Sequence, residues 1–365
     1  MDSVLLFTPI YPPYRGGGPN YYSSLINDLS EDIEIVVLTA THPEKPLRTT
    51  ESGAIVYRAL PRVRFFPRVV RALYEPLFAF ILTLLLIFYH RIDLVHSHST
   101  SIFAVGVGFA TATTSRPIVY DCRDEEFPRF LVRIGRTPVW FSCAQNIEDR
   151  LVSAGIPRPR IIHTPVVNPP LVSVTQHNPT TCAEHSLVFV GALRKEKGVF
   201  LTIDAFAEHI ERFPSARLRI VGAGPERDAI EDRLRRLALT EHVTLTGEVN
   251  HPEAVNHIAN ADVLLLPSAS EGMPRVVIEA MSVGTPVLAT RVGAIDEILS
   301  HGVNGLFIDD STTSLLDALN RVFSDEVLLE TITTGAEETT SDVEWGDVVA
   351  SVQEGYDRAL TDPKK

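Results

Sequence analysis

Short apolar runs alternate with longer stretches of mixed apolar and polar residues along the whole chain. Runs of this length, bounded by turn residues, are typical of buried parallel strands, and the stretches between them are long enough for crossover helices. Residues 198–210, G-V-F-L-T-I-D-A-F-A-E-H-I, are one of the helical stretches. The apolar runs lie at residues 4–7, 33–38, 94–97, 117–120, 138–142 and 160–163, and then at 186–190, 217–221, 242–246, 262–266 and 286–290.

This alternation predicts an α/β protein with two Rossmann-like, doubly wound parallel-sheet domains. Residues 164–181 separate the two series of strands, because they hold four prolines and show no helical period. We therefore predict an N-terminal domain over 1–165, a linker over 166–182 and a C-terminal domain over 183–342. Ligands bind beyond the carboxyl ends of the strands in open α/β sheets, so we expect the site in a cleft that both domains face.

The composition narrows the possible partners. A net charge of −13 argues against nucleic acid, whose phosphates attract basic surfaces. The three cysteines show no C-x-x-C spacing and predict free thiols rather than a metal site. The N-terminus, M-D-S-V-L-L-F, has no basic region before its apolar residues, so we interpret it as a first strand and not as a secretory signal.

One segment is basic and aromatic, although the chain as a whole has a net negative charge. It spans residues 58–71 and directly precedes the apolar run 76–89, P-L-F-A-F-I-L-T-L-L-L-I-F-Y. That run is shorter than the ~20 residues needed to span a bilayer. It predicts either a buried core helix or an element at a membrane surface, with arginines on anionic headgroups. The candidate membrane or acceptor residues are Arg62, Arg64, Phe65, Phe66, Arg68 and Arg71.

Two loops of the second half carry features of an anion site. The run 186–190 leads into G-A-L-R-K-E-K-G, a loop from Gly191 that carries Arg194 and Lys197 just before a predicted helix. Helix N-termini with nearby cations bind anions, although a single surface lysine is usually only solvated. The run 217–221 ends in V-G-A-G-P-E, where Gly222 and Gly224 permit either a close backbone approach to a ligand or an ordinary turn.

The most specific stretch follows the run 262–266 and reads S-E-G-M-P-R-V-V-I-E-A-M-S-V. Glu271 stands before a turn, and Glu279 lies among apolar helical residues, where a carboxylate is costly unless it has a partner. The first backbone N–H groups of this helix have no partner within the helix, and they lie at the positive end of its dipole. Two carboxylates that flank such a helix end match a diphosphate with hydroxyls on both sides, as in a nucleotide sugar.

The block over residues 270–287, with V-G-A-I-D-E-I-L and G-V-N-G-L-F after it, resembles the family-4 retaining glycosyltransferases of the two-Rossmann GT-B type. The resemblance extends over nearly the whole chain. It implies that Glu271 contacts the donor sugar, that Glu279 holds the ribose and that Lys197 binds phosphate. It also implies that Gly247 lies beside the nucleobase. The main chain near the phosphates and the sugar would be that of Gly272, Met273, Pro274, Arg275 and Val276.

The first half resembles the same family. The loop P-P-Y-R-G-G-G-P-N-Y-Y, with Gly17 and Gly18, is similar to the loop that approaches the donor phosphates and the acceptor. The run D-L-V-H-S-H-S is similar to the strand whose last histidine, here His98, lies near the reacting sugar, whereas His96 is expected in the sheet packing. The final helix, over 343–361, resembles the segment that crosses back to the N-terminal domain.

Two positions depart from the family pattern. Ala192 stands where the family has a phosphate-binding arginine, and Arg194 is the candidate to replace it. Thr164 stands before Pro-Val where the family has asparagine. The first change puts the affinity for diphosphate in question, while neither removes a carboxylate.

The resemblance implies a hexosyl transfer with retention, catalysed by His98, Glu271, Lys197 and Arg194, with no metal and no cofactor beyond the nucleotide-sugar substrate. We expect a lipid-linked or membrane-associated acceptor and peripheral contact with the cytoplasmic face of the membrane. Two alternatives stay open: a nucleotide-sugar 2-epimerase of the same fold, or a non-catalytic GT-B subunit. An NAD oxidoreductase is disfavoured because no G-x-G-x-x-G follows the first strand.

Overall fold

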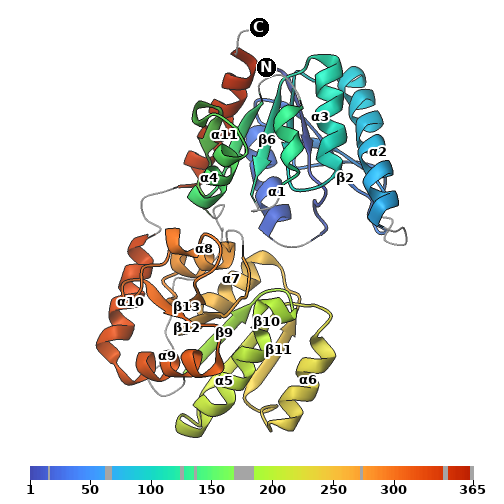
Figure 1. The fold of residues 1–365 in the computed structure, drawn as a ribbon. Helices are drawn as coiled ribbons and strands as arrows, with labels where there is room; N and C mark the ends of the chain where they lie inside the picture. The colour runs from blue at the N-terminus through green and yellow to red at the C-terminus, as the bar shows by residue number, and fades with distance from the viewer. Residues whose placement is uncertain are drawn as a thin grey trace. The chain divides into compact units, whose positions relative to one another are not determined.

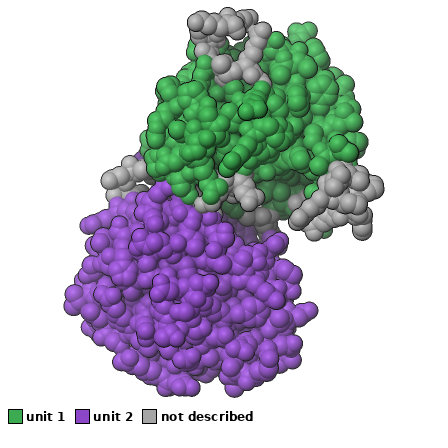
Figure 2. All heavy atoms as spheres, in the orientation of Figure 1, with its two compact units in different colours: residues 1–165, 345–365 green, residues 166–344 purple. Residues whose placement is uncertain are grey.

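The structure is a computed structural model that describes residues 1–14, 17–61, 68–123, 127–134, 138–167, 185–271, 274–339 and 344–361. The chain divides into two compact units. The N-terminal unit holds Met1–Pro165 and Trp345–Lys365, and the C-terminal unit holds Val166–Glu344, as Figure 2 shows in green and purple. Most of the linker predicted over 166–182 lies outside the described residues.

The N-terminal unit is built on one eight-stranded sheet with the order β3-β4-β2-β1-β5-β6-β7-β8. Every pairing is parallel except that of β3 with β4. The strands are β1 (Ser3–Phe7), β2 (Glu34–Ala40), β3 (Arg48–Glu51), β4 (Ala54–Leu60), β5 (Leu94–His98), β6 (Ile118–Cys122), β7 (Val139–Ser142) and β8 (Ile161–His163). Strands β1, β5, β6 and β7 are buried along their whole length, as expected where helices cover both faces of a parallel sheet.

The helices of this unit are α1 (Gly17–Leu29), α2 (Arg68–Tyr89), α3 (Phe103–Thr114), α4 (Gln145–Ser153) and α11 (Trp345–Thr361), with short 3-10 turns at Arg129–Arg133 and Arg158–Arg160. Figure 1 shows α2 and α3 side by side on one flank of the unit. Helix α11 follows the C-terminal unit in the sequence, yet it packs against β5–β8 and α1 of the N-terminal unit.

The C-terminal unit has a six-stranded parallel sheet with the order β11-β10-β9-β12-β13-β14. Its strands are β9 (Ser186–Val190), β10 (Arg217–Val221), β11 (Val243–Gly247), β12 (Val263–Leu266), β13 (Val287–Thr290) and β14 (Gly305–Ile308). Its helices are α5 (Val199–Arg212), α6 (Arg227–Arg236), α7 (His251–Ala259), α8 (Arg275–Ser282), α9 (Thr312–Ser324) and α10 (Glu326–Thr339), with 3-10 turns at Lys195–Lys197 and Ile295–Glu297.

The strand order places the candidate site. From β9 the chain adds β10 and β11 on one side and β12, β13 and β14 on the other, so the order reverses between β9 and β12. The loops after two such strands diverge and leave a crevice at the carboxyl edge, which is where doubly wound sheets bind ligands. The α/β fold with two parallel-sheet domains is confirmed, and the hairpin of β3 and β4 and the strand β14 are additions to the predicted elements.

Candidate active site

Two predicted residues meet at the reversal point of the C-terminal sheet. Lys197 follows β9 and Glu271 follows β12, and the Lys197 ammonium lies 2.7 Å from Oε2 of Glu271. The lysine side chain is 27% exposed and the carboxylate only 9%, so the pair is open to solvent from the lysine side. The structure therefore joins a cation and a carboxylate that the sequence separates by 74 positions.

The backbone holds the two loops together. Gly198 ends the 3-10 turn that carries Lys197, with φ of +72°, a conformation that favours glycine. A Cβ at Gly198 would lie 1.9 Å from the carbonyl oxygen of Pro267, in the loop after β12. In addition, the N–H of Ala269 donates to the carbonyl of Glu196 at 2.8 Å. Because no side chain fits between these loops at Gly198, Lys197 and Glu271 come within reach of each other.

The remaining glycines of this edge pack against one another. The N–H of Gly191 donates to Val221, and the N–H of Gly222 donates to Gly247, at 3.0 and 2.9 Å. A Cβ on Gly222 would lie 1.9 Å from the carbonyl oxygen of Gly191, and one on Gly224 would lie 2.3 Å from that of Leu193. The close approach that these glycines permit is thus between neighbouring loops, and their contact with a donor remains a prediction.

Glu279 has a partner within the chain. It is only 7% exposed on α8, and its Oε1 lies 2.9 Å from Nε2 of His251, the first residue of α7. The side chain of Asn250 caps α7 by accepting from the N–H of Glu253, and this orients the helix start that carries the histidine. The resemblance assigned Glu279 to a ribose, and the structure adds that His251 offsets the cost of burying its carboxylate.

The start of α8 is the other part of the predicted phosphate site. The helix begins at Arg275, and its N-cap residue Pro274 makes no side-chain cap. The predicted residues Gly272 and Met273 lie outside the described residues, while Arg275 and Val276 form the first turn. Arg194, the candidate to replace the missing arginine, is exposed, and its guanidinium lies 3.6 Å from Glu196.

In the N-terminal unit, His98 is the last residue of β5 and is 8% exposed. Its Nδ1 lies 2.9 Å from Oγ1 of Thr100, and its ring meets the ring of Tyr22 edge to face. Gly17 and Gly18 form the first turn of α1, the helix that also carries Tyr22. The carboxyl end of β5 and the start of α1 therefore hold the residues that the sequence analysis selected in this half.

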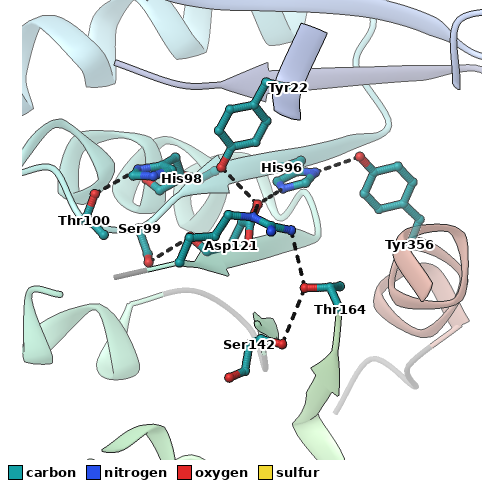
Figure 3. A network of polar contacts seen from close by, with 11 residues as sticks. Tyr22, His96, His98, Ser99, Thr100, Asp121, Ser142, Thr164 and Tyr356 are labelled. Atoms are coloured by element: carbon teal, nitrogen blue, oxygen red, sulfur yellow. Dashed lines mark hydrogen bonds and ion pairs between the residues drawn. The ribbon is translucent and has the colours of Figure 1, made fainter. Parts of the chain in front are cut away.

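A buried polar network lies beside His98 and meets it through the ring of Tyr22 (Figure 3). The hydroxyl of Tyr22 donates to Oδ2 of Asp121 at 2.9 Å, and Nε of Arg123 donates to the same oxygen at 2.9 Å. Nε2 of His96 lies 3.5 Å from that oxygen, and its Nδ1 lies 2.8 Å from the hydroxyl of Tyr356 on α11. The network thus ties α1, β5 and β6 to the C-terminal helix.

Charge balance explains why this network tolerates burial. Burial alone would raise the pKa of Asp121, but the positive charge of Arg123, with help from His96, holds that pKa well below its usual value. Conversely, burial and the neighbouring carboxylate raise the pKa of Tyr22 well above its usual value. Asp121 is therefore an anion at neutral pH, and Arg123, whose guanidinium lies over the ring of Tyr21, is its counter-ion.

The segment proposed for membrane contact is only partly described. Arg62, Arg64, Phe65 and Phe66 lie outside the described residues, and of Arg68 only its place at the start of α2 is given. Arg71 pairs with Glu75 at 2.7 Å. Arg58, which the basic segment included, is buried in β4 and pairs with Glu51 at 2.6 Å. Arg58 therefore supports the sheet and does not face a surface.

Helix α2 itself is longer than the apolar run suggested. Residues Arg71–Tyr89 are long and apolar enough, by length and composition alone, to cross a membrane, and 28% of that stretch is buried within the structure. Its buried side packs against α3, where a Cβ on Gly106 would lie 1.9 Å from the carbonyl oxygen of Pro76. The other side is exposed, and its apolar residues recur at helical spacing: Leu73, Leu77, Phe78, Ile81, Leu85, Phe88 and Tyr89.

Sequence reasoning missed three residues of these sites. His251, Tyr22 and Asp121 belong to the contacts described above. Tyr22 ends the glycine-rich loop quoted in the sequence analysis but was given no role there, and the other two stand in the sequence without a motif. For Asp121 and His251 the available signal was position, because Asp121 directly follows the predicted strand 117–120 and His251 follows shortly after the predicted strand 242–246. Strand ends collect ligand-binding residues in this kind of sheet, so position alone could have selected Asp121 and His251.

Two parallel-sheet units, with carboxylates and a lysine at the reversal point, define a GT-B protein. Residues 181–339 match the family described as Glycosyl transferases group 1. The fold agrees with solved structures: a sucrose-phosphate synthase of Thermosynechococcus elongatus (16% identity, TM-score 0.78, 100% of both chains) and an Anabaena protein crystallised with UDP-glucose (20% identity, TM-score 0.73, 97% of this chain and 98% of that one).

Curated relatives match over a part or nearly the whole of the chain. An uncharacterised glycosyltransferase of Methanocaldococcus jannaschii is 36% identical over 143 residues, which are 39% of this chain and 36% of the relative. The match thus spans about a third of that relative's length. A second uncharacterised glycosyltransferase of the same organism is 24% identical over 97% of both chains.

Proposed function

We propose that this protein is a retaining glycosyltransferase that moves a sugar from a nucleoside diphosphate to an acceptor hydroxyl. The observation that carries the proposal is the pair of Lys197 and Glu271 at the reversal point of the C-terminal sheet, inside the stretch that matches the family. A nucleotide sugar presents a diphosphate to a cation and sugar hydroxyls to a carboxylate. Lys197, which is open to solvent, can bind the diphosphate, and the neighbouring Glu271 can accept hydrogen bonds from the sugar hydroxyls.

The same residues have chemical roles in the proposed reaction. The bond from the anomeric carbon to the diphosphate breaks, a bond to the acceptor oxygen forms on the same face, and the acceptor proton passes to the departing phosphate. The leaving group gains negative charge, which Lys197, Arg194 and the first N–H groups of α8 would stabilise. An ammonium has three donors, so Lys197 can bind phosphate and still contact Glu271. No step in this scheme requires a metal.

Glu279 and the N-terminal unit complete the proposed site. Glu279 would exchange part of its contact with His251 for ribose hydroxyls, and His98 would lie near the reacting sugar. Gly17 and Gly18 would approach the phosphates. Because these groups belong to separate units, we propose that the units close on the substrates before transfer.

The donor prediction is tested by thermal unfolding with a panel of UDP-, GDP- and ADP-sugars. One of these donors should raise the melting temperature by about 5 °C when present at 100 times its Kd, since such binding adds ~2.7 kcal/mol of stability. Glu279→Ala should remove most of the shift, whereas Glu253→Ala, at an exposed carboxylate of α7, should retain it. A panel in which no donor stabilises the wild-type protein contradicts the proposal.

The same donor separates transfer from epimerisation. A 2-epimerase converts the nucleotide sugar without an acceptor, while a transferase produces free nucleoside diphosphate and a glycosylated product. A non-catalytic subunit would bind the donor and do neither. The match to the glycosyl transferases group 1 family favours transfer.

For the acceptor we propose a lipid-linked or membrane-associated molecule, as in surface polysaccharide synthesis or protein glycosylation, at the cytoplasmic face of the cell membrane. The support is the exposed apolar side of α2, on which Leu73, Leu85 and Phe88 are 74%, 61% and 72% exposed. Single exposed apolar residues are ordinary, but seven recur at helical spacing along one helix. Such a helix, whose other side packs on α3, is suited to lie in the membrane interface.

Vesicle sedimentation tests the membrane contact. Wild-type protein should bind vesicles of phosphatidylglycerol and phosphatidylcholine, and Leu77→Ser with Leu85→Ser should weaken binding about tenfold per leucine, since each loses roughly 1–2 kcal/mol of apolar burial. Val327→Ser removes a residue of the C-terminal unit that is 72% exposed and should have no effect. Equal binding by the double variant, or absence of binding by the wild type, contradicts the proposal.

A further inference from the structure

The contact between His251 and Glu279 lies at the same edge of the C-terminal sheet as the pair of Lys197 and Glu271. His251 is the first residue of α7, which follows β11, and Glu279 lies on α8, which follows β12. Both helices begin beyond the carboxyl ends of parallel strands, which is the edge where such a sheet binds ligands. The proposed function assigns the ribose to Glu279 and gives no role to His251.

Helices α7 and α8 are held together without this polar contact. They pack against each other, and the apolar residues that they bury in one cluster include Val255, Ile258, Val277 and Met281. The hydroxyl of Thr285, which follows α8, also donates to the carbonyl of Ile258 at 3.0 Å. Because apolar burial already favours the packing of these helices, an imidazole and a carboxylate between them require a different explanation.

The start of α7 holds the imidazole in place. Asn250 caps the helix by accepting from the N–H of Glu253 at 2.9 Å, and Pro252, next to His251, restricts the backbone of the first turn. The His251 side chain is only 15% exposed. The helix cap, the proline and the enclosure of the ring together fix where Nε2 lies.

The contact with His251 leaves part of the carboxylate available to a ligand. Nε2 of His251 donates to Oε1 of Glu279 at 2.9 Å, since an ionised carboxylate can only accept. No other residue within the described ranges donates a hydrogen bond to this carboxylate. Oε2 can therefore accept from a ligand, and Oε1 keeps a second lone pair. Two hydroxyls on adjacent carbons, as in ribose, can donate to a carboxylate held in this way.

A fixed carboxylate binds hydroxyls better than a mobile one. The glutamate side chain has several rotatable bonds, and a binding site loses affinity when the ligand has to order such a side chain. His251 orders the carboxylate of Glu279 before any donor binds. Without the imidazole, the buried carboxylate would lack a donor and would turn toward water, away from the ribose.

We infer that His251 is a positioning residue of the donor site. It holds Glu279 in the orientation that accepts from the ribose hydroxyls, and it thereby makes the site select ribonucleotides over deoxyribonucleotides. The inference rests on the proposed function and deepens it by naming the residue that sets this selectivity. When the donor binds, Oε1 is shared between the imidazole and a hydroxyl, and the hydrogen bond from His251 is retained.

Calorimetric titration of the full chain tests the inference. The probes are UDP, GDP and ADP, followed by the 2′-deoxy and 3′-deoxy forms of the one that binds. Wild-type protein should bind the ribonucleotide at least tenfold more tightly than one of its deoxy forms, because a hydrogen bond to a charged group is lost. This ratio of dissociation constants measures how well Glu279 reads the ribose.

Two amide variants separate positioning from packing. The amide nitrogen of glutamine can take the place of Nε2, so His251→Gln should keep the ratio within about twofold of the wild-type value. His251→Asn carries the same amide on a side chain one carbon shorter and should lower the ratio about threefold to tenfold, the scale of ordering one side chain. His257→Asn is the matched control, since His257 lies in the last turn of α7 and should leave the ratio unchanged.

The outcomes distinguish the inference from the proposed function. A contact that only stabilises the fold would lower the melting temperature of His251→Asn and leave its ratio equal to that of the wild type, and this result overturns the inference. Equal binding of the ribonucleotide and both deoxy forms by the wild type also overturns it, while the donor proposal stands. A wild-type protein that binds none of the three nucleoside diphosphates contradicts the donor proposal itself.

Discussion

Replacing Lys197 with methionine is expected to lower the rate of nucleoside diphosphate release from the donor sugar by about 10²–10³-fold. Removing one preorganised group that stabilises developing charge typically has this effect. The side chain that replaces the lysine has similar length but carries no charge, so the packing of the loop after β9 is largely retained. Assays that quantify the released nucleoside diphosphate at fixed times measure the change in kcat/KM. The donor used is the one identified by thermal unfolding.

The neighbouring lysine supplies the control. Lys195 lies in the same 3-10 turn and is exposed, and the described residues show no ion pair for it. Lys195→Met should therefore change the rate less than threefold, roughly the scale of a distant surface charge. If Lys197→Met and Lys195→Met reduce the rate equally, Lys197 has no special role and the pair with Glu271 is structural only.

The second large effect is on stability. Asp121→Asn should destabilise the N-terminal unit by about 3–5 kcal/mol, because it leaves the Arg123 guanidinium without its buried counter-ion. Urea unfolding followed by tryptophan fluorescence reports on the N-terminal unit, since both tryptophans, Trp140 and Trp345, lie there. Asp149→Asn, which breaks an exposed pair with Arg158, should cost less than about 1 kcal/mol.

The pH dependence of this effect has a defined sign. The pKa of Asp121 is lower in the folded protein than in the unfolded chain, so its stabilising contribution is complete above the unfolded value of about 4. The contribution is lost as the pH falls from about 4 toward the lower folded pKa. The stability difference between wild type and Asp121→Asn should therefore be constant from pH 5 to 7 and should narrow below pH 4. A difference that stays constant down to pH 3, or that is already small at pH 7, contradicts this account.

The local pattern of apolar and polar residues was sufficient to predict most of the strands of both sheets. Continuous apolar runs such as residues 4–7 and 186–190 lie inside β1 and β9 because a parallel strand is buried on both faces and leaves no polar alternation. The hairpin of β3 and β4 was missed since its polar residues, such as Arg48 and Glu51, do not form such a run. Arg58 appeared to belong to a basic surface because its partner Glu51 is brought close only when that hairpin pairs.

The sequence by itself determined the class of fold, the resemblance to a glycosyltransferase family through residues 270–287, and the positions of Lys197, Glu271 and Glu279 at strand ends or in the following helix. These depend on residues that are near one another along the chain. The tertiary structure alone decided which of them touch. Lys197 meets Glu271 because the strand order brings the loops after β9 and β12 together, and His96 meets Tyr356 across 260 positions because α11 packs back on the first sheet. Contacts of this kind, like that of His251 with Glu279, follow from strand order and packing, which leave no periodic signal in the sequence.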